Sequence, residues 1–205
     1  MNCSAVYFLS VQKNNFRVYS PEMMTTWKSF LEFDDRVSHR LRLTPANKGW
    51  WQVVTVLAHS GDSWFLLAGL AVLWLLGNSA WRERAVVFGV GIVVLACLVF
   101  AIKFTVRRQR PAGEWGAIYR NTDPHSFPSG HAARVTMLAV IGLGLGPLWF
   151  GLLLIVWAPL VSLARVMTGL HYLSDVLAGM LLGLLVGLAM LAAQPLLVSY
   201  LPFLF

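Results

Sequence analysis

Hydrophobic residues in this chain are gathered into long uninterrupted runs. Four runs contain no Asp, Glu, Lys or Arg, and they cover residues 63–77, 85–102, 135–164 and 176–205. A helix needs about 20 mostly apolar residues to cross a bilayer core of about 30 Å. The runs therefore predict membrane-spanning helices, and an all-α integral membrane bundle as the fold class.

The run 135–164 is too long for one span, because a helix of its length would extend about 45 Å. Glycines and Pro147 lie near its middle, where a turn would occur. We therefore expect two helices there, at about 129–145 and 147–165. Three further helices are expected at about 62–78, 85–103 and 174–193. The bundle then has about five spans, with six as the open alternative. Asn78 to Arg84 is expected to form a polar turn, and Gly179, Gly183 and Gly187 to permit close helix packing.

The N-terminal part has a different pattern. Residues 26–43 place apolar side chains such as Trp27 and Leu41 on one helical face and charges on the other. This pattern predicts a helix lying on the membrane surface, or equally one packed on other protein. The chain thus divides into an N-terminal segment, 1–48, and a transmembrane domain, 49–205.

Composition supports a membrane protein. The 205 residues are 58% hydrophobic and 12% charged, with a net charge of +7. An ordinary soluble domain has about 25% charged residues. Because the basic residues cluster beside apolar runs, the charge indicates contact with lipid headgroups or phosphate and not with nucleic acid.

The polar residues lie at the ends of the predicted spans. Lys103 ends the second span and His131 begins the third, while Arg165 ends the fourth and Asp175 begins the fifth. Consecutive spans cross the membrane in opposite directions. These ends, His171 and the Arg-rich loop after the second span are therefore expected on one membrane face.

This set of side chains suits phosphate binding. Lys103 and Arg110 face the same way if the helix persists until Pro111. Ser129 is a good helix N-cap and Gly130 lets the backbone approach a ligand, so the helix start can bind an oxyanion. Together with Arg165, these groups describe a phosphate pocket.

Two histidines are candidate catalytic residues for this pocket. His171 and Asp175 are four positions apart, hence on one helical face, and the carboxylate could orient the imidazole. His131 could supply a proton. This combination is typical of phosphoryl transfer through a phosphohistidine.

Three motifs carry a family resemblance. Lys103-x6-Arg110-Pro111, Pro128-Ser129-Gly130-His131 and Arg165-x5-His171-x3-Asp175 resemble the signature motifs of the type 2 phosphatidic acid phosphatase (PAP2) superfamily. The resemblance covers about 62–193. It implies a helical membrane bundle that hydrolyses phosphate monoesters or diphosphates of lipids without a metal. It also implies His171 as nucleophile, Asp175 as its partner and His131 as the acid for the leaving alkoxide. The implied phosphate ligands are Lys103, Arg110, Ser129, Gly130 and Arg165.

One position departs from the resemblance. The family usually has Ser before the third-motif arginine, and this chain has Ala164. A catalytically weakened PAP2-like protein that binds or transports lipid is therefore the alternative function. The absence of charge within the spans favours reaction on a headgroup at the membrane surface instead.

Other polar residues receive ordinary interpretations. We expect Arg107 and Arg108 to contact lipid headgroups, and His59 and Asp62 to form a cap or turn. No Cys/His cluster has zinc spacing and no carboxylate pair suggests magnesium, so neither a metal nor a cofactor is expected. Partners are a lipid phosphate substrate and membrane lipids.

Substrate and sidedness stay open at this stage. Candidate substrates are polyprenyl diphosphate, phosphatidylglycerophosphate and phosphatidic acid, and the expected location is a bacterial inner membrane. The N-terminal segment has seven Lys/Arg and the 78–84 turn has two. The positive-inside rule thus indicates a cytoplasmic site, whereas many members of the resembled family face outward.

Overall fold

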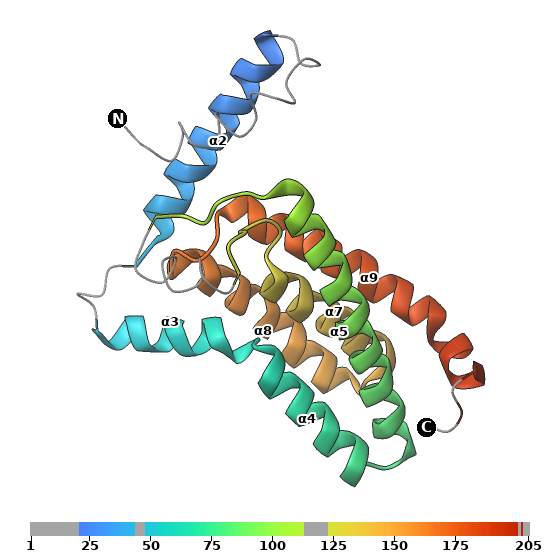
Figure 1. Ribbon diagram of the computed structural model, residues 1–205. Helices are drawn as coiled ribbons and strands as arrows, with labels where there is room; N and C mark the ends of the chain where they lie inside the picture. Colours follow the sequence, from blue (N-terminus) through green and yellow to red (C-terminus); the bar gives the residue numbers. More distant parts are fainter. Residues whose placement is uncertain (1–20, 44–47, 113–122, 201, 203–205) are drawn as a thin grey trace.

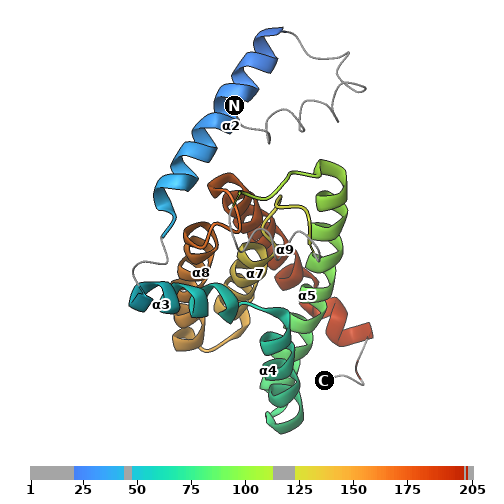
Figure 2. The same ribbon diagram turned by 60° about the vertical axis from the view of Figure 1, so that its left-hand side comes forward.

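The computed structural model describes residues 21–43, 48–112, 123–200 and 202, and within these ranges the chain is a helical bundle. Its helices are α2 (Pro21–Leu41), α3 (Lys48–Ser60), α4 (Ser63–Leu76), α5 (Ser79–Val106), α7 (Gly130–Leu145), α8 (Leu148–Met167) and α9 (Leu173–Tyr200). In Figure 1, α5, α7, α8 and α9 form the body of the bundle, and α3 and α4 lie along one side. Figure 2 shows from a second direction that α2 projects beyond one end. The predicted all-α fold class is confirmed.

Membrane-spanning length is reached by several of these helices. Within the described ranges, α5, α8 and α9 are long and apolar enough to cross a bilayer. The pair α3 and α4 meets the same criterion together, with a bend of 57° between them. Helix α7 is apolar but shorter, at 16 residues. The five predicted spans correspond in order to α4, α5, α7, α8 and α9, and α3 extends the first of them.

The long apolar run is divided where its composition indicated. Helix α7 ends at Leu145 and α8 begins at Leu148, and the Gly146 amide donates to the Gly142 carbonyl at 2.9 Å. A side chain at Gly151 would lie 2.8 Å from Leu143 Cα, so only glycine allows the two helices to pack this closely after the turn. The predicted reversal is confirmed, and it returns α8 to the end of the bundle where α7 starts.

Close packing of α9 on α7 depends on the predicted glycines. An ideal Cβ on Gly179 would lie 2.4 Å from the Ser129 carbonyl oxygen, and one on Gly183 would lie 2.1 Å from that of Ala133. Such contacts leave no room for a methyl group. The α9 backbone therefore lies directly against the first turns of α7.

The turn before α5 is shorter than expected. Helix α5 already begins at Ser79, and Asn78 Oδ1 accepts a hydrogen bond from the Trp81 amide at 3.1 Å. The prediction of a polar turn over 78–84 was wrong for residues 79–84. Asn is a strong N-cap and the following Arg and Glu residues are good helix formers, so the helix starts as soon as the cap is available.

The other end of α5 also differs from the prediction. The helix stops at Val106, Arg107 adopts a left-handed conformation (φ 53°), and the expected continuation to Pro111 does not occur. Pro111 disfavours helical conformation only at Arg110, and the left-handed Arg107 ends the helix before that point. The chain instead doubles back, with Gln109 bridging His125 and the Ser126 amide donating to the Arg108 carbonyl at 2.8 Å.

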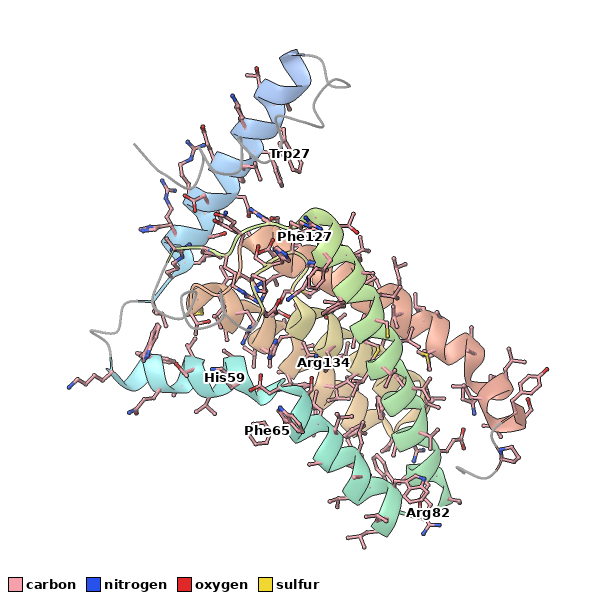
Figure 3. All side chains as sticks on the ribbon, in the orientation of Figure 1. Trp27, His59, Phe65, Arg82, Phe127 and Arg134 are labelled. Carbon is pink, nitrogen blue, oxygen red and sulfur yellow. The ribbon has the colours of Figure 1, made fainter. Side chains whose placement is uncertain are left out.

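Helix α2 is attached to the bundle at its C-terminal end. The Leu43 amide donates to the Met167 carbonyl at 3.0 Å, and Arg42 Nη1 donates to the Ala112 carbonyl at 3.0 Å. Figure 3 shows Trp27 on the part of α2 that extends beyond the bundle, and this side chain is 51% exposed. The predicted helix is present; Trp27, Phe30 and Leu41 of its apolar face are exposed, whereas Leu31 and Val37 are partly buried.

Candidate active site

A cavity of about 310 Å³ lies where α5 and α8 end and α7 begins. Its polar wall consists of Lys103, Asp123, Gly130, His131, Arg134, Arg165 and His171, and its apolar wall includes Leu95, Val99, Phe100 and Phe104. The wall thus contains five of the eight residues selected from the sequence. Arg110, Ser129 and Asp175 lie immediately behind it. The predicted convergence at one end of the bundle is therefore present.

His171 presents one ring nitrogen to the cations of this cavity. Its Nε2 atom lies 3.2 Å from Arg110 Nη1. Because a guanidinium group only donates hydrogen bonds, Nε2 is the acceptor and the proton sits on Nδ1. Nδ1 lies 3.7 Å from Asp175 Oδ2, beyond hydrogen-bond length but close enough for attraction once the ring is charged.

The His171–Asp175 pair is built by a helix start and not by a helical face. Helix α9 begins at Leu173, so His171 lies in the preceding turn. Asp175 Oδ2 accepts a hydrogen bond from the Tyr172 amide at 2.9 Å, as an acidic residue in the first helical turn commonly does. The predicted pairing is present, but the helical geometry expected for it was wrong.

The surroundings of His171 keep its imidazole neutral. The residue is 1% exposed. Burial lowers its pKa well below the usual value of 6.5, and the Arg165, Arg110 and Lys103 cations lower it further. A lowered pKa means that protonation requires more acid than usual. The unprotonated Nε2 therefore persists through neutral pH, as a nucleophile needs.

Two of the predicted phosphate ligands converge on one carboxylate. Arg110 Nη2 donates to Asp123 Oδ2 at 2.7 Å, and Lys103 Nζ forms an ion pair with the same oxygen. Arg110 Nε also donates to the Asp123 carbonyl at 2.8 Å. Burial raises the pKa of Asp123, but the two cations outweigh it and the net shift is downward, so the carboxylate is ionised. A negatively charged oxygen is thus stabilised at the point where Lys103 and Arg110 meet.

The remaining phosphate-ligand candidates differ in position. Arg165, at 1% exposure, extends from the end of α8, lines the cavity and donates from Nη1 to the Ala58 carbonyl of α3 at 3.3 Å. Ser129 is fully buried and caps α7, with its Oγ accepting from the Ala132 amide at 3.5 Å. The Ser129 amide donates to the Asp175 carbonyl at 2.9 Å, which joins the second motif to the third. Gly130 and His131 then face the cavity from the first turn of α7.

His131 has a carboxylate partner that the sequence did not suggest. Its Nε2 atom lies 2.5 Å from Asp62 Oδ1, and His59 Nδ1 lies 3.3 Å from the other oxygen of Asp62. Asp62 occupies the N-cap position of α4 but makes no side-chain cap. The expected turn is present, since the Asp62 amide donates to the His59 carbonyl at 2.9 Å, but the bend between α3 and α4 also directs the Asp62 side chain to the second motif.

Arg134 and its neighbours hold this bend in place. Arg134 Nη1 donates to the Gly61 carbonyl at 2.8 Å, and Trp157 Nε1 donates to Ser60 Oγ at 2.9 Å. Figure 3 labels Arg134 within the bundle and His59 on α3. Arg134 follows His131 by three positions, which places both on one helical face. This spacing was the signal in the sequence that could have identified Arg134 as a residue of the site.

The Ala164 departure lies away from the cavity. Its side chain is 2% exposed and clusters with Val54 and Ala58 of α3. A serine side chain at this position would lie on the side of α8 that faces α3. The departure therefore leaves the cavity wall unchanged.

Comparison with known proteins identifies the family. A profile of the PAP2 superfamily matches residues 84–198, which is more than half of the chain. The chain belongs to the PAP2 superfamily. It is a membrane phosphatase of this type, and the resemblance found in its three motifs is confirmed.

Individual relatives agree with this assignment. The chain is 36% identical over 137 residues to a decaprenylphosphoryl-5-phosphoribose phosphatase of Mycobacterium tuberculosis, covering 64% of this chain and 73% of the relative. It is 38% identical over 104 residues to an undecaprenyl-diphosphatase of Sulfolobus acidocaldarius, covering 46% of this chain and 50% of that protein. The crystal structure of a PAP2-type phosphatidylglycerolphosphate phosphatase from Bacillus subtilis matches with a TM-score of 0.67, 20% identity and 96% coverage of both chains. At that identity, the match shows a shared fold.

Proposed function

We propose that this PAP2 phosphatase hydrolyses a lipid phosphate monoester or diphosphate through a phosphohistidine on His171. The observation that carries the proposal is the direction of His171 Nε2, whose lone pair faces Arg110 at 3.2 Å while Nδ1 faces Asp175. A neutral imidazole whose unprotonated Nε2 lies among cations is arranged to attack an anionic phosphorus centre that those cations bind.

In the first step, Nε2 forms a bond to phosphorus as the bond from phosphorus to the leaving oxygen breaks. Lys103, Arg110 and Arg165 neutralise the charge that develops on the phosphoryl oxygens. Once His131 carries a proton on both nitrogens, it gives its Nδ1 proton to the leaving oxygen while Nε2–H stays bonded to Asp62. Asp175 stabilises the charge that His171 acquires when its ring nitrogen is phosphorylated.

In the second step, water attacks the phosphohistidine. His131 now accepts a proton from the water, the nitrogen–phosphorus bond breaks, and inorganic phosphate leaves. The proton on His131 Nδ1 is thereby restored for the next cycle. Every proton and bond is accounted for by side chains of this chain and water, so we propose no metal in the reaction.

The apolar wall of the cavity supports a lipid as substrate. Phe100 and Phe104 line the cavity, yet they are 63% and 45% exposed on the outer surface of α5. A hydrocarbon chain attached to a phosphate in the cavity could pass along these rings into the bilayer. Since the relatives described above include enzymes named for decaprenyl and undecaprenyl substrates, we propose a polyprenyl-linked phosphate as the first candidate, before phosphatidylglycerophosphate and phosphatidic acid.

The alternative of a weakened, lipid-binding relative receives no support from the site. Ala164 is its only motivation in the sequence, and this residue packs against α3 and not against the cavity. We further propose a bacterial inner membrane as the location, in line with the bacterial origin of the Mycobacterium and Bacillus proteins.

The test is a phosphate-release panel on the purified full chain in detergent with EDTA present. The substrates are undecaprenyl diphosphate, phosphatidylglycerophosphate and phosphatidic acid. We expect release of phosphate from at least one lipid, undiminished by EDTA. His171→Gln should lower the rate by about 10³-fold or more, because it removes the nucleophile.

The matched control is His39→Gln, since His39 is an exposed histidine on α2. It should keep the wild-type rate. A rate that depends fully on an added divalent metal, or a fully active His171→Gln variant, would contradict the proposed mechanism.

A further inference from the structure

Helix α2 buries two polar side chains although most of its surface is exposed. Asp34 is 4% exposed and Ser38 is fully buried, whereas the adjacent Asp35 and His39 are exposed. Residues four positions apart share a helical face, so Asp34 and Ser38 both face the bundle. A carboxylate buried in this way is costly unless its oxygens are hydrogen-bonded or paired with a cation.

The first partners of these two side chains are backbone amides of α9. Ser38 Oγ accepts from the Leu173 amide at 2.9 Å, and Asp34 Oδ1 accepts from the Ser174 amide at 3.0 Å. The first amides of a helix have no partner within the helix itself. Two side chains of α2 therefore cap α9 at the turn that holds Asp175.

The second partner of Asp34 is Arg108, which also binds Asp175. Arg108 Nη2 donates to Asp34 Oδ2 at 2.6 Å, and Nη1 donates to Asp175 Oδ1 at 2.7 Å. The Arg108 guanidinium also lies 4.0 Å from the centre of the Tyr172 ring. Headgroup contact was the expectation for Arg108, but its terminal nitrogens are directed inward to two buried carboxylates.

We propose that Asp34 is a positioning residue for catalysis, acting through Arg108 to fix Asp175 behind His171. The path consists of four groups in sequence: the Asp34 carboxylate, the Arg108 guanidinium, the Asp175 carboxylate and the His171 ring. Asp175 Oδ1 is bound by Arg108 and Oδ2 by the Tyr172 amide, so the direction of its carboxylate is fixed on both sides. This inference rests on the proposed role of His171 as nucleophile.

The geometry separates positioning from substrate binding. Asp34, Ser38 and Arg108 are absent from the cavity wall. Loss of Asp34 leaves Lys103, Arg110 and Arg165 in place to hold phosphate. The turnover number should therefore fall while the affinity for the lipid phosphate is retained.

The experiment compares Asp34→Asn with Asp35→Asn in the full chain. The first substitution keeps the size of the side chain but removes the charge that faces Arg108, and the second changes the exposed neighbour. The measurement is kcat and KM with the lipid phosphate on which the wild-type chain is most active in the panel above. Asp34→Asn should lower kcat about 10- to 100-fold with KM within about twofold, because a small misplacement of a catalytic group has effects of that size. Asp35→Asn should change neither.

Two further variants distinguish positioning from general stability. Asp34→Glu keeps a carboxylate that can face Arg108, so it should retain more of kcat than Asp34→Asn does. In an Arg108→Gln background, Asp34→Asn should lower kcat little further, because both changes act on the same path. If Asp34→Asn does not give folded protein, Arg108→Lys replaces it. Lysine keeps the charge but cannot bridge two carboxylates through a fork, and the same separation of kcat from KM is expected.

The outcomes separate this inference from the proposed function. A folded Asp34→Asn protein with wild-type kcat, or one whose KM rises while kcat is unchanged, would overturn the positioning role. Fully additive effects with Arg108→Gln would do the same. If His171→Gln is inactive and Asp34→Asn is fully active, only the role of α2 fails. If His171→Gln is active, the proposed mechanism fails first.

Discussion

Single carboxylates organise this site by holding the two histidines from behind. Asp62 binds His131 at Nε2, so only Nδ1 of that ring is left to meet a substrate. Asp175 lies behind His171, where it can balance a positive ring but does not occupy the attacking nitrogen. Each aspartate thus favours the positively charged form of the histidine it faces. For His131 this form is the proton donor, and for His171 it is the ring that becomes charged when it attacks phosphorus.

Replacement of Asp62 tests this division of roles. Asp62→Asn removes the charge that stabilises protonated His131, so it should forfeit part of the roughly 10²- to 10⁴-fold contribution of general acid catalysis. The loss in kcat should be large for a lipid phosphate, whose alkoxide needs a proton. It should be much smaller for p-nitrophenyl phosphate, whose leaving group needs none. An equal loss with both substrates would show that Asp62 does not act through proton donation.

Which residues were predictable depends on how far apart their partners lie in the chain. Ser129, Gly130 and His131 form one local motif, and their placement at a helix start follows from the capping preference of serine. The contact of Asp62 with His131 joins positions 69 apart, and that of Asp34 with Arg108 joins positions 74 apart. No periodicity or local spacing in one sequence encodes such a pair, so these carboxylates were recognised only in the folded chain.

Helices bring the motifs together through small residues and short turns. Gly179 and Gly183 let α9 approach the first turns of α7, and the Gly146–Pro147 turn returns α8 to the same end. These features were predictable because glycine spacing and a Gly-Pro break have direct geometric consequences. The end of α5 was not predicted correctly. There Arg110 reaches Lys103 through a reversal of the chain and a shared carboxylate, and not through a continued helix.

The packing of α9 on α7 can be tested with one methyl group. A Cβ on Gly183 would lie 2.1 Å from the Ala133 carbonyl oxygen, so Gly183→Ala must push the two backbones apart. We expect a loss of about 1–3 kcal/mol of stability, typical of overpacked cores, and a lower kcat because the start of α7 is displaced. Thermal unfolding in detergent and phosphate release measure the two effects.

Gly89→Ala is the matched control, because a Cβ on this α5 glycine meets nothing within 4 Å. It should be neutral or stabilising by up to about 1 kcal/mol, since alanine is the better helix former. If Gly183→Ala is as stable and as active as this control, the close approach of α7 and α9 is not required.

At the scale of the whole molecule, the buried charged side chains of the described residues lie at one end of a largely apolar bundle. Large apolar side chains such as Trp64, Leu76 and Leu148 are highly exposed on its sides, as expected of a surface that faces lipid. The cavity joins the polar end to the exposed surface of α5 through Phe100 and Phe104. The predicted division of the chain at residue 48 stays a prediction, but α2 of the N-terminal segment contacts the turn that holds Asp175. The segment and the site are therefore physically connected.

The central claim is that His171 becomes covalently phosphorylated during turnover. Rapid acid-free quenching of the wild-type chain, mixed with lipid whose reactive phosphoryl group carries ³²P, tests it most directly. The account predicts a burst of label on the protein, stable to base and labile to acid as a phosphohistidine is, which peptide mapping places on His171. Unlabelled protein during steady turnover, or label on any other residue, would contradict it.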